Sequence, residues 1–355
     1  MRHAIALAKK GIGAVAPNPL VGAVVVKEGK IIGEGYHERF GGLHAERNAL
    51  GSCTDSPKDA TLFVTLEPCC HYGKTPPCTE AILEAGIRKV IIGSRDPNPK
   101  VAGKGAAILR EAGILVEEDF LKEECDALNA PFFHYISTGR PYVAMKYAMT
   151  ADGKIASFTG ASQWITNEES RHHVHTLRHE YQGILAGIGT VLADNPLLTC
   201  RMPKGRNPIR IICDSRLRIP LDSHLVQTAK EIPLLVATCS KDREKQKALR
   251  KAGAEILEFQ GATVPLDMLM EVLGKRQIGS ILLEGGSTLN GSFLEAGLVQ
   301  RLYTYIGAKI LGGEMAKSPI GGKGLPSPHC SPTLHLQEVK AFGNDILCVY
   351  SIEKE

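Results

Sequence analysis

The sequence predicts an α/β protein built from two domains, residues 1–140 and residues 141–355. Helix and strand patterns alternate along both halves of the chain. The length of 355 residues exceeds what a single hydrophobic core usually serves. Residues 137–141 form a short polar segment in which Gly139 and Pro141 break the preceding helix, so we place the domain boundary there.

The first half has the pattern of a mixed sheet covered by helices. Glu28 and Gly29 form a hairpin turn between the first two predicted strands. Helices are expected at residues 2–10, 44–50, 78–85, 105–112 and 119–136, and strands at residues 21–26, 30–36, 61–66, 89–93 and 114–116.

The second half again alternates, and a new strand is expected to begin at Tyr142. A turn at residues 343–345 joins the last two strands, and residues 321–332, rich in Gly, Pro and Ser, predict a surface loop. Further strands are expected at residues 209–213, 233–237, 256–259, 280–283, 334–341 and 346–352, with a helix at residues 241–252.

The composition is that of an ordinary globular protein, with 43% hydrophobic and 23% charged residues. A net charge of +4 is too mild to indicate nucleic acid by itself, and it suits a small anionic substrate such as a phosphate ester. No apolar run approaches the length of a membrane span, and the N-terminus lacks the apolar core of a signal peptide. The ten cysteines are scattered, which favours a reduced cytoplasm over a disulfide framework.

One histidine and two cysteines form the most informative pattern of the chain. Zinc at a catalytic site commonly takes three protein ligands and leaves a fourth position for water. His44, Cys69 and Cys78 can supply those ligands, and Glu46 can move the protons of that water. A His-x-Glu triplet followed by Pro-Cys and a second Cys is the pattern of base deaminases. The sequence therefore predicts a zinc-dependent deaminase with Glu46 as its catalytic residue.

The local sequence adds two geometric expectations. Residues i and i+2 of a helix do not share a face, so His44 must lie at the start of its helix for Glu46 to reach the same metal. Cys78 is expected to open a helix, where the dipole favours a thiolate. The polar loop at residues 70–77 can line a pocket for a substrate larger than a bare base. The alternatives are a purely structural zinc site, unrelated buried cysteines, or Cys70 as a competing ligand.

Two polar residues upstream remain open in their interpretation. Asn18 stands between two prolines, where it is either a rigidly held group that reads a base or part of an ordinary turn. His37, just after a predicted strand, is equally ambiguous.

Two patterns in the second half give weaker evidence of a binding site. Residues 280–287 indicate a strand that leads through a Gly-Gly turn into a helix, whose N–H groups can hold a phosphate. No Gly-x-Gly-x-x-Gly follows an early strand, so a Rossmann fold is not predicted. His175 and His179 share a helix face, yet no third ligand is evident, so a solvated histidine-rich face is favoured over a second metal site.

Several longer motifs resemble one family, the bifunctional riboflavin-biosynthesis deaminase–reductases, and the resemblance spans nearly the whole chain. In the first half they are PNPLVG (17–22), HAE (44–46), TLEPC (65–69), GKTPPC (73–78) and DPNP (96–99). In the second half they are DGK (152–154), SQWIT (162–166), GTVLADNP (189–196) and EGG (284–286).

The resemblance implies a cytidine-deaminase-like three-layer α/β/α domain followed by a dihydrofolate-reductase-like α/β domain. It implies zinc-dependent hydrolytic deamination of 2,5-diamino-6-(5-phosphoribosylamino)pyrimidin-4(3H)-one by residues 1–140. Residues 141–355 would then reduce the ribosyl chain with NADPH, giving 5-amino-6-(5-phosphoribitylamino)uracil. The family's reductase half also suggests a homo-oligomer.

The resemblance further implies binding residues in the second half. Those facing NADPH would be Ala148, Trp164, Thr190, Asp194, Ser215, Gly286, Ser287, Thr288, Leu289, Asn290, Gly291 and Ser292. Those facing the substrate would be Ser162, Arg178, Leu198, Arg201 and Glu284.

Arginines are the natural partners of the phosphates in both ligands. Arg178 and Arg201 suit the substrate phosphate, because guanidinium binds phosphate in a bidentate manner, although either arginine alone could be a solvated surface charge. Arg216 and Arg218 follow Ser215 and could meet the 2'-phosphate of NADPH, or could be solvated surface charges.

Two other functions fit the sequence less well. A nucleic-acid base deaminase with an accessory domain is disfavoured by the mild charge and the 5% aromatic content. A non-catalytic protein stabilised by zinc is disfavoured by the presence of Glu46. A small phosphorylated pyrimidine is therefore the expected partner, with neither nucleic acid nor membrane.

Overall fold

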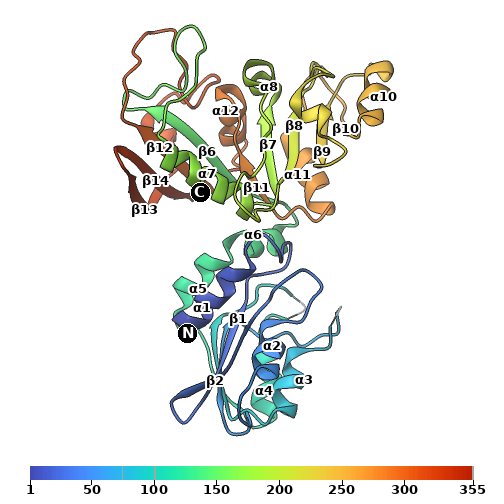
Figure 1. The fold of residues 1–355 in the computed structure, drawn as a ribbon, viewed down its shortest axis with the longest axis vertical. Coiled ribbons are helices and arrows are strands. Elements are labelled where there is room, and N and C mark those ends of the chain that lie inside the picture. The colour runs from blue at the N-terminus through green and yellow to red at the C-terminus, as the bar shows by residue number, and fades with distance from the viewer. Residues whose placement is uncertain (74, 100, 354–355) are drawn as a thin grey trace. The chain divides into compact units, whose positions relative to one another are not determined.

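A computed structural model describes residues 1–73, 75–99 and 101–353 (Figure 1). The chain forms two compact units, Met1–Arg140 and Pro141–Glu355. Each unit has its own hydrophobic core. In the part of the chain that is described, no helix is both long enough and apolar enough to cross a membrane.

The first unit is a three-layer α/β/α structure around a five-stranded sheet (Figure 1). Its strand order is β2-β1-β3-β4-β5, antiparallel at β2-β1-β3 and parallel from β3 to β5. Helices α1 and α5 contact each other on one face, and α2, α3 and α4 lie together on the other. The strands are β1 (Gly22–Lys27), β2 (Lys30–Tyr36), β3 (Thr61–Leu66), β4 (Lys89–Ser94) and β5 (Leu115–Glu117), and the helices are α1 (Arg2–Ala8), α2 (Ala45–Gly51), α3 (Cys78–Glu84), α4 (Lys104–Glu111) and α5 (Lys122–Leu128).

Close packing fixes α1 on the sheet. Ala4 and Leu7 of α1 pack on Val24 of β1. A Cβ at Gly22 would come within 1.9 Å of the Ala4 backbone oxygen, so only glycine fits at the start of β1. This close approach gives the glycine of the PNPLVG motif a structural reason.

The prediction of one helix at residues 119–136 is wrong, because the chain forms α5 and then α6 (Ala130–Thr138). Between them the Asn129 side chain accepts from the Leu20 N–H at 2.8 Å and donates to the Leu20 carbonyl at 2.9 Å. Pro131 in the first turn of α6 has no N–H to continue the preceding helix. The helix predicted at residues 2–10 is also shorter, since α1 ends at Ala8 and a 3-10 turn, Lys9–Gly11, follows.

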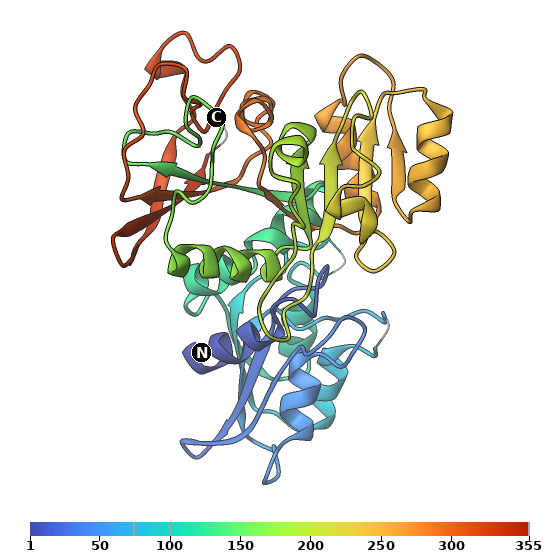
Figure 2. The same cartoon turned by 45° about the horizontal axis from the view of Figure 1, so that its top comes forward.

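The second unit is built on a nine-stranded sheet with the order β10-β9-β8-β7-β11-β6-β12-β14-β13. The strands from β10 to β12 run parallel, and β14 and β13 add an antiparallel hairpin at one edge, opposite β10 (Figure 2). The strands are β6 (Tyr142–Thr150), β7 (Gly183–Gly187), β8 (Ile209–Cys213), β9 (Leu234–Thr238), β10 (Glu255–Glu258), β11 (Ser280–Leu283), β12 (Arg301–Gly307), β13 (Leu334–Phe342) and β14 (Asp345–Ile352).

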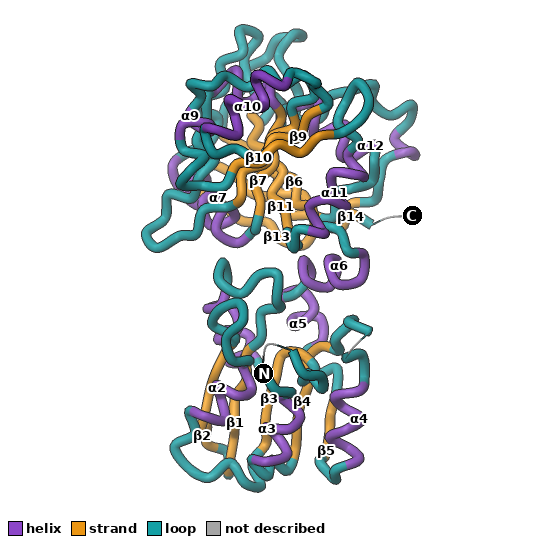
Figure 3. Tube along the Cα trace, turned by 90° about the vertical axis from the view of Figure 1, so that its right-hand side faces the viewer, coloured by secondary structure: helices purple, strands orange, loops and turns teal. Residues whose placement is uncertain are grey.

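Helices bury both faces of this sheet, as a parallel sheet requires (Figure 3). Alternate residues of one strand pack into the hydrophobic cores on opposite faces of the sheet. Leu185 of β7 packs with Leu273 of α11 and Phe293 of α12, whereas its neighbour Ile184 packs with Val191 of α8 and Leu249 of α10. The helices are α7 (Glu168–Glu180), α8 (Ile188–Asp194), α9 (His224–Gln227), α10 (Arg243–Lys251), α11 (Leu266–Lys275) and α12 (Ser287–Glu295).

The predicted α/β class is confirmed in both units. The predicted surface loop at residues 321–332 is also confirmed; it is largely exposed and contains only a 3-10 turn, Pro328–Cys330. The carboxyl ends of the parallel strands meet along one edge of each sheet, and both candidate sites lie at such edges.

Candidate active sites

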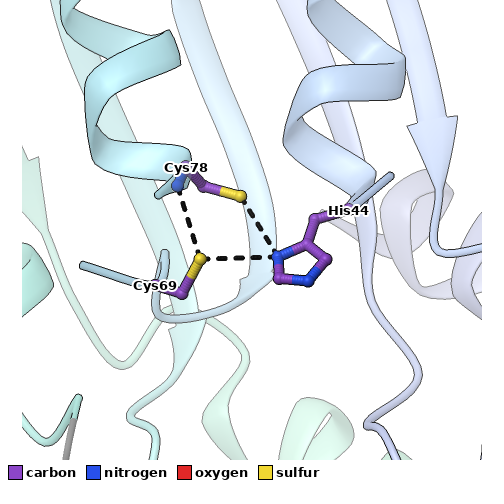
Figure 4. Close-up of side chains that lie close together, drawn as sticks. All are labelled: His44, Cys69 and Cys78. Carbon is purple, nitrogen blue, oxygen red and sulfur yellow. Dashed lines mark hydrogen bonds between the residues drawn. The ribbon is translucent and has the colours of Figure 1, made fainter. Parts of the chain in front are cut away.

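Three side chains from separate elements of the first unit converge on one point (Figure 4). His44 is the N-cap of α2, Cys69 follows β3, and Cys78 is the first residue of α3. The His44 Nδ1 lies 3.4 Å from the Sγ of Cys69 and 3.4 Å from the Sγ of Cys78. His44 at the helix start and Cys78 at a helix opening both confirm the geometric expectations.

The donor set fits zinc. A tetrahedral ion with the usual Zn–S and Zn–N bond lengths places nitrogen and sulfur about 3.5 Å apart. The two N···S distances of 3.4 Å agree with this, and all three donor atoms lie within 4.8 Å of one another. Across residues 1–73, 75–99 and 101–353, no other group of three His, Cys, Asp or Glu side chains comes this close.

The two cysteines shift each other's pKa in opposite directions. The Cys78 N–H donates to the Cys69 Sγ at 3.3 Å. Hydrogen bonds from the Cys78 thiol and from His44 lower the pKa of Cys69 to about 4, and the same thiol bond raises the pKa of Cys78. These opposite shifts favour the thiolate at Cys69 over Cys78, and metal binding by both sulfurs would release the proton of Cys78.

Glu46 lies beside the cluster in the first turn of α2 and is 3% exposed. Its Oε2 atom has no hydrogen-bond partner among the described residues. Burial, and then the charge of Cys69, raise the pKa of Glu46 to about 7. A carboxylate with a near-neutral pKa can take and return a proton, so its chemistry suits a proton shuttle.

The loop that carries the cysteines is tied to the helix that carries His44. Arg47 Nη2 donates to the Pro77 carbonyl at 2.8 Å, directly before Cys78. The Thr75 hydroxyl lies 3.5 Å from the His44 Nε2. Lys74 of the same loop motif lies outside the described residues. Cys70, weighed as a competing ligand, does not join the cluster.

Asn18 and His37 lie next to the His44 side chain. The Asn18 Nδ2 lies 3.2 Å from the His37 Nε2, and the His37 Nδ1 lies 3.0 Å from the Leu43 carbonyl. The ring of His37 meets the ring of His44 edge-on, with 5.4 Å between centroids. Asn18 is thus linked through the His37 imidazole to His44 of the cluster, beyond its place in a turn.

The second unit contains a cavity of about 1190 Å³ at the carboxyl ends of β6, β11, β7 and β8. Its volume exceeds the roughly 300–1,000 Å³ of common ligand pockets, so it has room for a cofactor and a substrate together. The predicted residues that line it are Ala148, Ser162, Trp164, Arg178, Thr190, Asp194, Arg201, Ser215, Glu284, Gly286, Ser287, Thr288, Leu289, Asn290 and Ser292.

Two residues predicted for this site do not line the cavity. Leu198 is 4% exposed and packs in the core beneath α8. Gly291 lies inside α12 against a neighbouring loop, where a Cβ would come within 1.9 Å of the Gly321 backbone oxygen. Both positions serve the packing that shapes the cavity.

The cavity has the features of a dinucleotide site. Helix α12 begins at Ser287 with Gly286 as its cap, and the free N–H groups of such a helix start attract phosphate. A Cβ at Gly285 would lie 2.9 Å from the Asn290 Oδ1, so the turn before α12 has little room for a side chain. The residues present therefore fit a nicotinamide dinucleotide.

A buried charge network lies in the cavity wall. Arg178 donates to both carboxylate oxygens of Glu284, at 2.7 and 2.9 Å, and Lys146 Nζ lies 3.8 Å from the same carboxylate. Burial alone would raise the pKa of Glu284, but the charges of Arg178 and Lys146 outweigh it and hold this pKa at about 2. Arg178 also donates to the Thr199 carbonyl, so its guanidinium is largely committed within the protein.

Arg201, unlike Arg178, has no carboxylate partner in the described part of the chain and is bound to a histidine. Its Nε donates to the His175 Nε2 at 3.1 Å, and its terminal nitrogens have no partner among the described residues. Burial and the charges of Arg178 and Arg201 lower the pKa of His175 to about 4, so this imidazole is neutral. The expectation of a solvated histidine face is wrong, because His175 is 9% exposed and His179 accepts from the Arg206 N–H.

Lys146 is a site residue that the sequence reasoning missed. It lies in β6 with a side chain 14% exposed. The signal was present, since a single lysine interrupts an otherwise uncharged strand, YVAMKYAMT. A charge in a strand buried on both faces needs a partner, and here the partner is Glu284.

Comparison with known families matches both units. The family model for the cytidine and deoxycytidylate deaminase zinc-binding region matches residues 1–94. The model for the RibD C-terminal domain matches residues 141–348. Fold and sites thus define a bifunctional enzyme that joins a zinc-dependent deaminase to a reductase.

Relatives that match nearly the whole chain identify the family more narrowly than the two domain models do. The riboflavin biosynthesis protein RibD of Actinobacillus pleuropneumoniae is 55% identical over 354 residues, 99% of this chain and 94% of the relative. RibD of Escherichia coli is 40% identical, with 99% and 98% covered. The solved diaminohydroxyphosphoribosylaminopyrimidine deaminase/5-amino-6-(5-phosphoribosylamino)uracil reductase of Thermotoga maritima is 40% identical with a TM-score of 0.90, covering 99% of this chain and 97% of that one. The chain belongs to the RibD family of riboflavin-biosynthesis proteins, which confirms the predicted family.

Proposed function

We propose that this chain catalyses two successive steps, one in each unit. Residues 1–140 would deaminate 2,5-diamino-6-(5-phosphoribosylamino)pyrimidin-4(3H)-one. Residues 141–355 would then reduce the ribosyl chain with NADPH to give 5-amino-6-(5-phosphoribitylamino)uracil. The observation that carries the proposal is a zinc-fitting His44–Cys69–Cys78 cluster beside an unpartnered Glu46 in one unit, with a dinucleotide-sized cavity in the other.

In the deaminase unit, His44, Cys69 and Cys78 would hold the zinc. Bound there, zinc supplies Lewis-acid activation of water. Glu46 would take a proton at its free Oε2 and return it to the leaving ammonia. Arg47 would keep Pro76 and Pro77 of the cysteine loop beside α2, where this part of the loop would line the substrate pocket.

In the reductase unit, NADPH supplies the hydride and the chain supplies binding and orientation. The start of α12, from Gly286 to Ser292, would hold the cofactor phosphates, together with Thr190, Asp194 and Ser215. Arg201, with its free terminal nitrogens, would bind the substrate phosphate. Glu284, kept ionised by Arg178, would accept hydrogen bonds from substrate hydroxyls.

The Glu46→Gln variant tests the division of labour. We expect it to abolish deamination, because an amide cannot take the proton, while NADPH oxidation on the deaminated intermediate continues at the wild-type rate. Mass spectrometry of products, with and without NADPH, reads out each step. Loss of both activities in a folded variant would contradict the division, and so would an unchanged deamination rate.

We further propose a cytoplasmic homo-oligomer that assembles through the reductase unit. All ten cysteines are free, as a reduced compartment allows. Strand β13 is an exposed sheet edge that carries Leu334, Leu336 and Val339 at 43–59% exposure, and such edges favour pairing with another chain. Light scattering of the purified protein tests the proposal, and a monomer at micromolar concentration would contradict it.

A further inference from the structure

Two arginines that follow β8 differ in where they lie. Arg218 lines the reductase cavity and Arg216 does not, although both are exposed. Neither has a hydrogen bond or an ion pair to any of the described residues. Arg218 is therefore a cation with free donors that faces a ligand cavity, and Arg216 is its matched neighbour outside it.

The backbone explains this difference and holds Arg218 in place. Leu217 adopts a left-handed conformation, with φ 53°, and its side chain is 2% exposed. Ile219 is fully buried, and its N–H donates at 2.7 Å to the Oδ2 of the buried Asp214. Arg218 thus stands between two buried anchors, so its position does not depend on a mobile loop.

Arg218 is also the one cation on its side of the cavity among the described lining residues. Lys146 lies in β6, and Arg171 and Arg178 lie in α7. Arg201 bonds to His175 of α7, and the Lys317 backbone pairs with Ile155, which follows β6. All five other cations therefore belong to the β6–α7 side, whereas Arg218 follows β8, three strands away in the sheet.

We propose that Arg218 binds the 2'-phosphate of the cofactor and makes the reductase select NADPH over NADH. This inference rests on the proposed function. The substrate groups gather around Glu284 and Arg201, which places the hydride end of the cofactor on the β6–α7 side. The phosphate-binding start of α12 follows the central strand β11, so the adenosine end extends toward β8 and Arg218. An arginine near the adenosine ribose is a general means of accepting a 2'-phosphate.

A carboxylate in the same cavity predicts that Arg218 affects the binding of NADPH and not that of NADH. Asp267, in the first turn of α11, also lines the cavity, and the preceding Val264 N–H donates to the Ser215 hydroxyl at 3.0 Å. A carboxylate repels a phosphate and accepts from a ribose hydroxyl. Arg218 must therefore offset Asp267 for NADPH to bind, and its loss should reduce NADPH binding without weakening NADH binding.

Steady-state kinetics of full-length Arg218→Ala and Arg216→Ala test the assignment. The ratio of kcat/KM for NADPH to kcat/KM for NADH should fall about 10- to 100-fold in Arg218→Ala, as expected for losing hydrogen bonds to a charged group. It should stay at the wild-type value in Arg216→Ala, and Arg218→Lys should retain part of it. An unchanged ratio in Arg218→Ala would overturn the inference, as would an equal fall in Arg216→Ala.

Calorimetric binding of adenosine 2',5'-bisphosphate and of 5'-AMP gives a readout without turnover. Arg218→Ala should weaken the bisphosphate about 10- to 100-fold and leave 5'-AMP unchanged. Equal weakening of both ligands would show that Arg218 only shapes the cavity. Failure of the proposed function looks different, because wild-type protein would then oxidise neither cofactor with the deaminated substrate.

Discussion

The zinc cluster and the reductase cavity are assembled in opposite ways. The cluster takes its ligands from one stretch of chain, from His44 to Cys78, through two helix starts and one loop. The cavity takes its walls from the ends of parallel strands, from the loops that follow them and from helices such as α7 and α12, and its lining extends from Lys146 to Lys317. The ligands of the metal site therefore come from one short segment of sequence, whereas the residues that line the cavity are brought together by the order of strands in the sheet.

The two sites also differ in how they hold charge. Glu46 has an unpartnered buried oxygen, and three donor atoms converge beside it, so the first site is incomplete without a ligand. Glu284 is already paired with Arg178 and Lys146. Removing one metal-binding side chain should thus abolish metal binding in the first unit. Removing one member of the Glu284 charge network should reduce the folding stability of the second unit.

The largest effect is expected from Cys78→Ala. Two ligands hold zinc far more weakly than three, so zinc should fall from about one per chain to nearly none, and deamination should be lost. Reduction of the deaminated intermediate should continue. Metal analysis and the two separate assays measure this outcome.

Cys70→Ala is the matched control, because Cys70 adjoins Cys69 but lies outside the cluster. It should retain zinc and both activities. Full zinc content in Cys78→Ala would contradict the ligand set, and loss of zinc in Cys70→Ala would reopen the choice of ligands.

The next effect is expected from Glu284→Gln, which leaves Arg178 buried without its counter-charge. Breaking a buried pair on one side costs about 3–5 kcal/mol, so the reductase unit should unfold at lower urea concentration. Glu258→Gln is the control in the same unit, since its pairs with Arg243 and Arg250 are at the surface and contribute little. Equal midpoints for the two variants would show that the network is unimportant to stability.

The same pair predicts a pH dependence. The pKa of Glu284 is depressed from the ordinary 4.5 to about 2 in the folded state. Stability from this depression is present above pH 4.5 and is lost as the pH falls from there toward 2. Urea midpoints of the wild type should fall across that window more steeply than those of Glu284→Gln.

The contrast explains what the sequence could predict. His44 and Cys78 were placed at helix starts from local rules alone, because spacing and helix geometry left few choices. Strand β3 was predicted at residues 61–66 because its apolar run is bounded by polar turns. Short-range chemistry governs these features, and short-range patterns show them.

Features that depend on distant partners were not predicted. Lys146 faces Glu284 only because β6 pairs with β11 in the sheet. Asn129 interrupts a helix by bonding to Leu20, far away in the sequence. Strand β7 is a five-residue run with a glycine at each end, and tertiary packing makes it a central strand. Such contacts become visible only once the topology is known.

The smallest effect is expected from Arg201→Ala. This variant distinguishes an arginine that binds the substrate from one that only supports the cavity wall. Arg178 is committed to Glu284 and Thr199, but the terminal nitrogens of Arg201 are free, so Arg201 should bear the substrate phosphate. Losing one charge-assisted contact should raise the reductase KM about tenfold, with kcat and the urea midpoint nearly unchanged. His172→Ala, an exposed change on α7, should leave both constants unaltered. An unchanged KM in Arg201→Ala would remove this residue from the phosphate site and return that role to Arg178, whose guanidinium would then have to exchange Glu284 for the substrate.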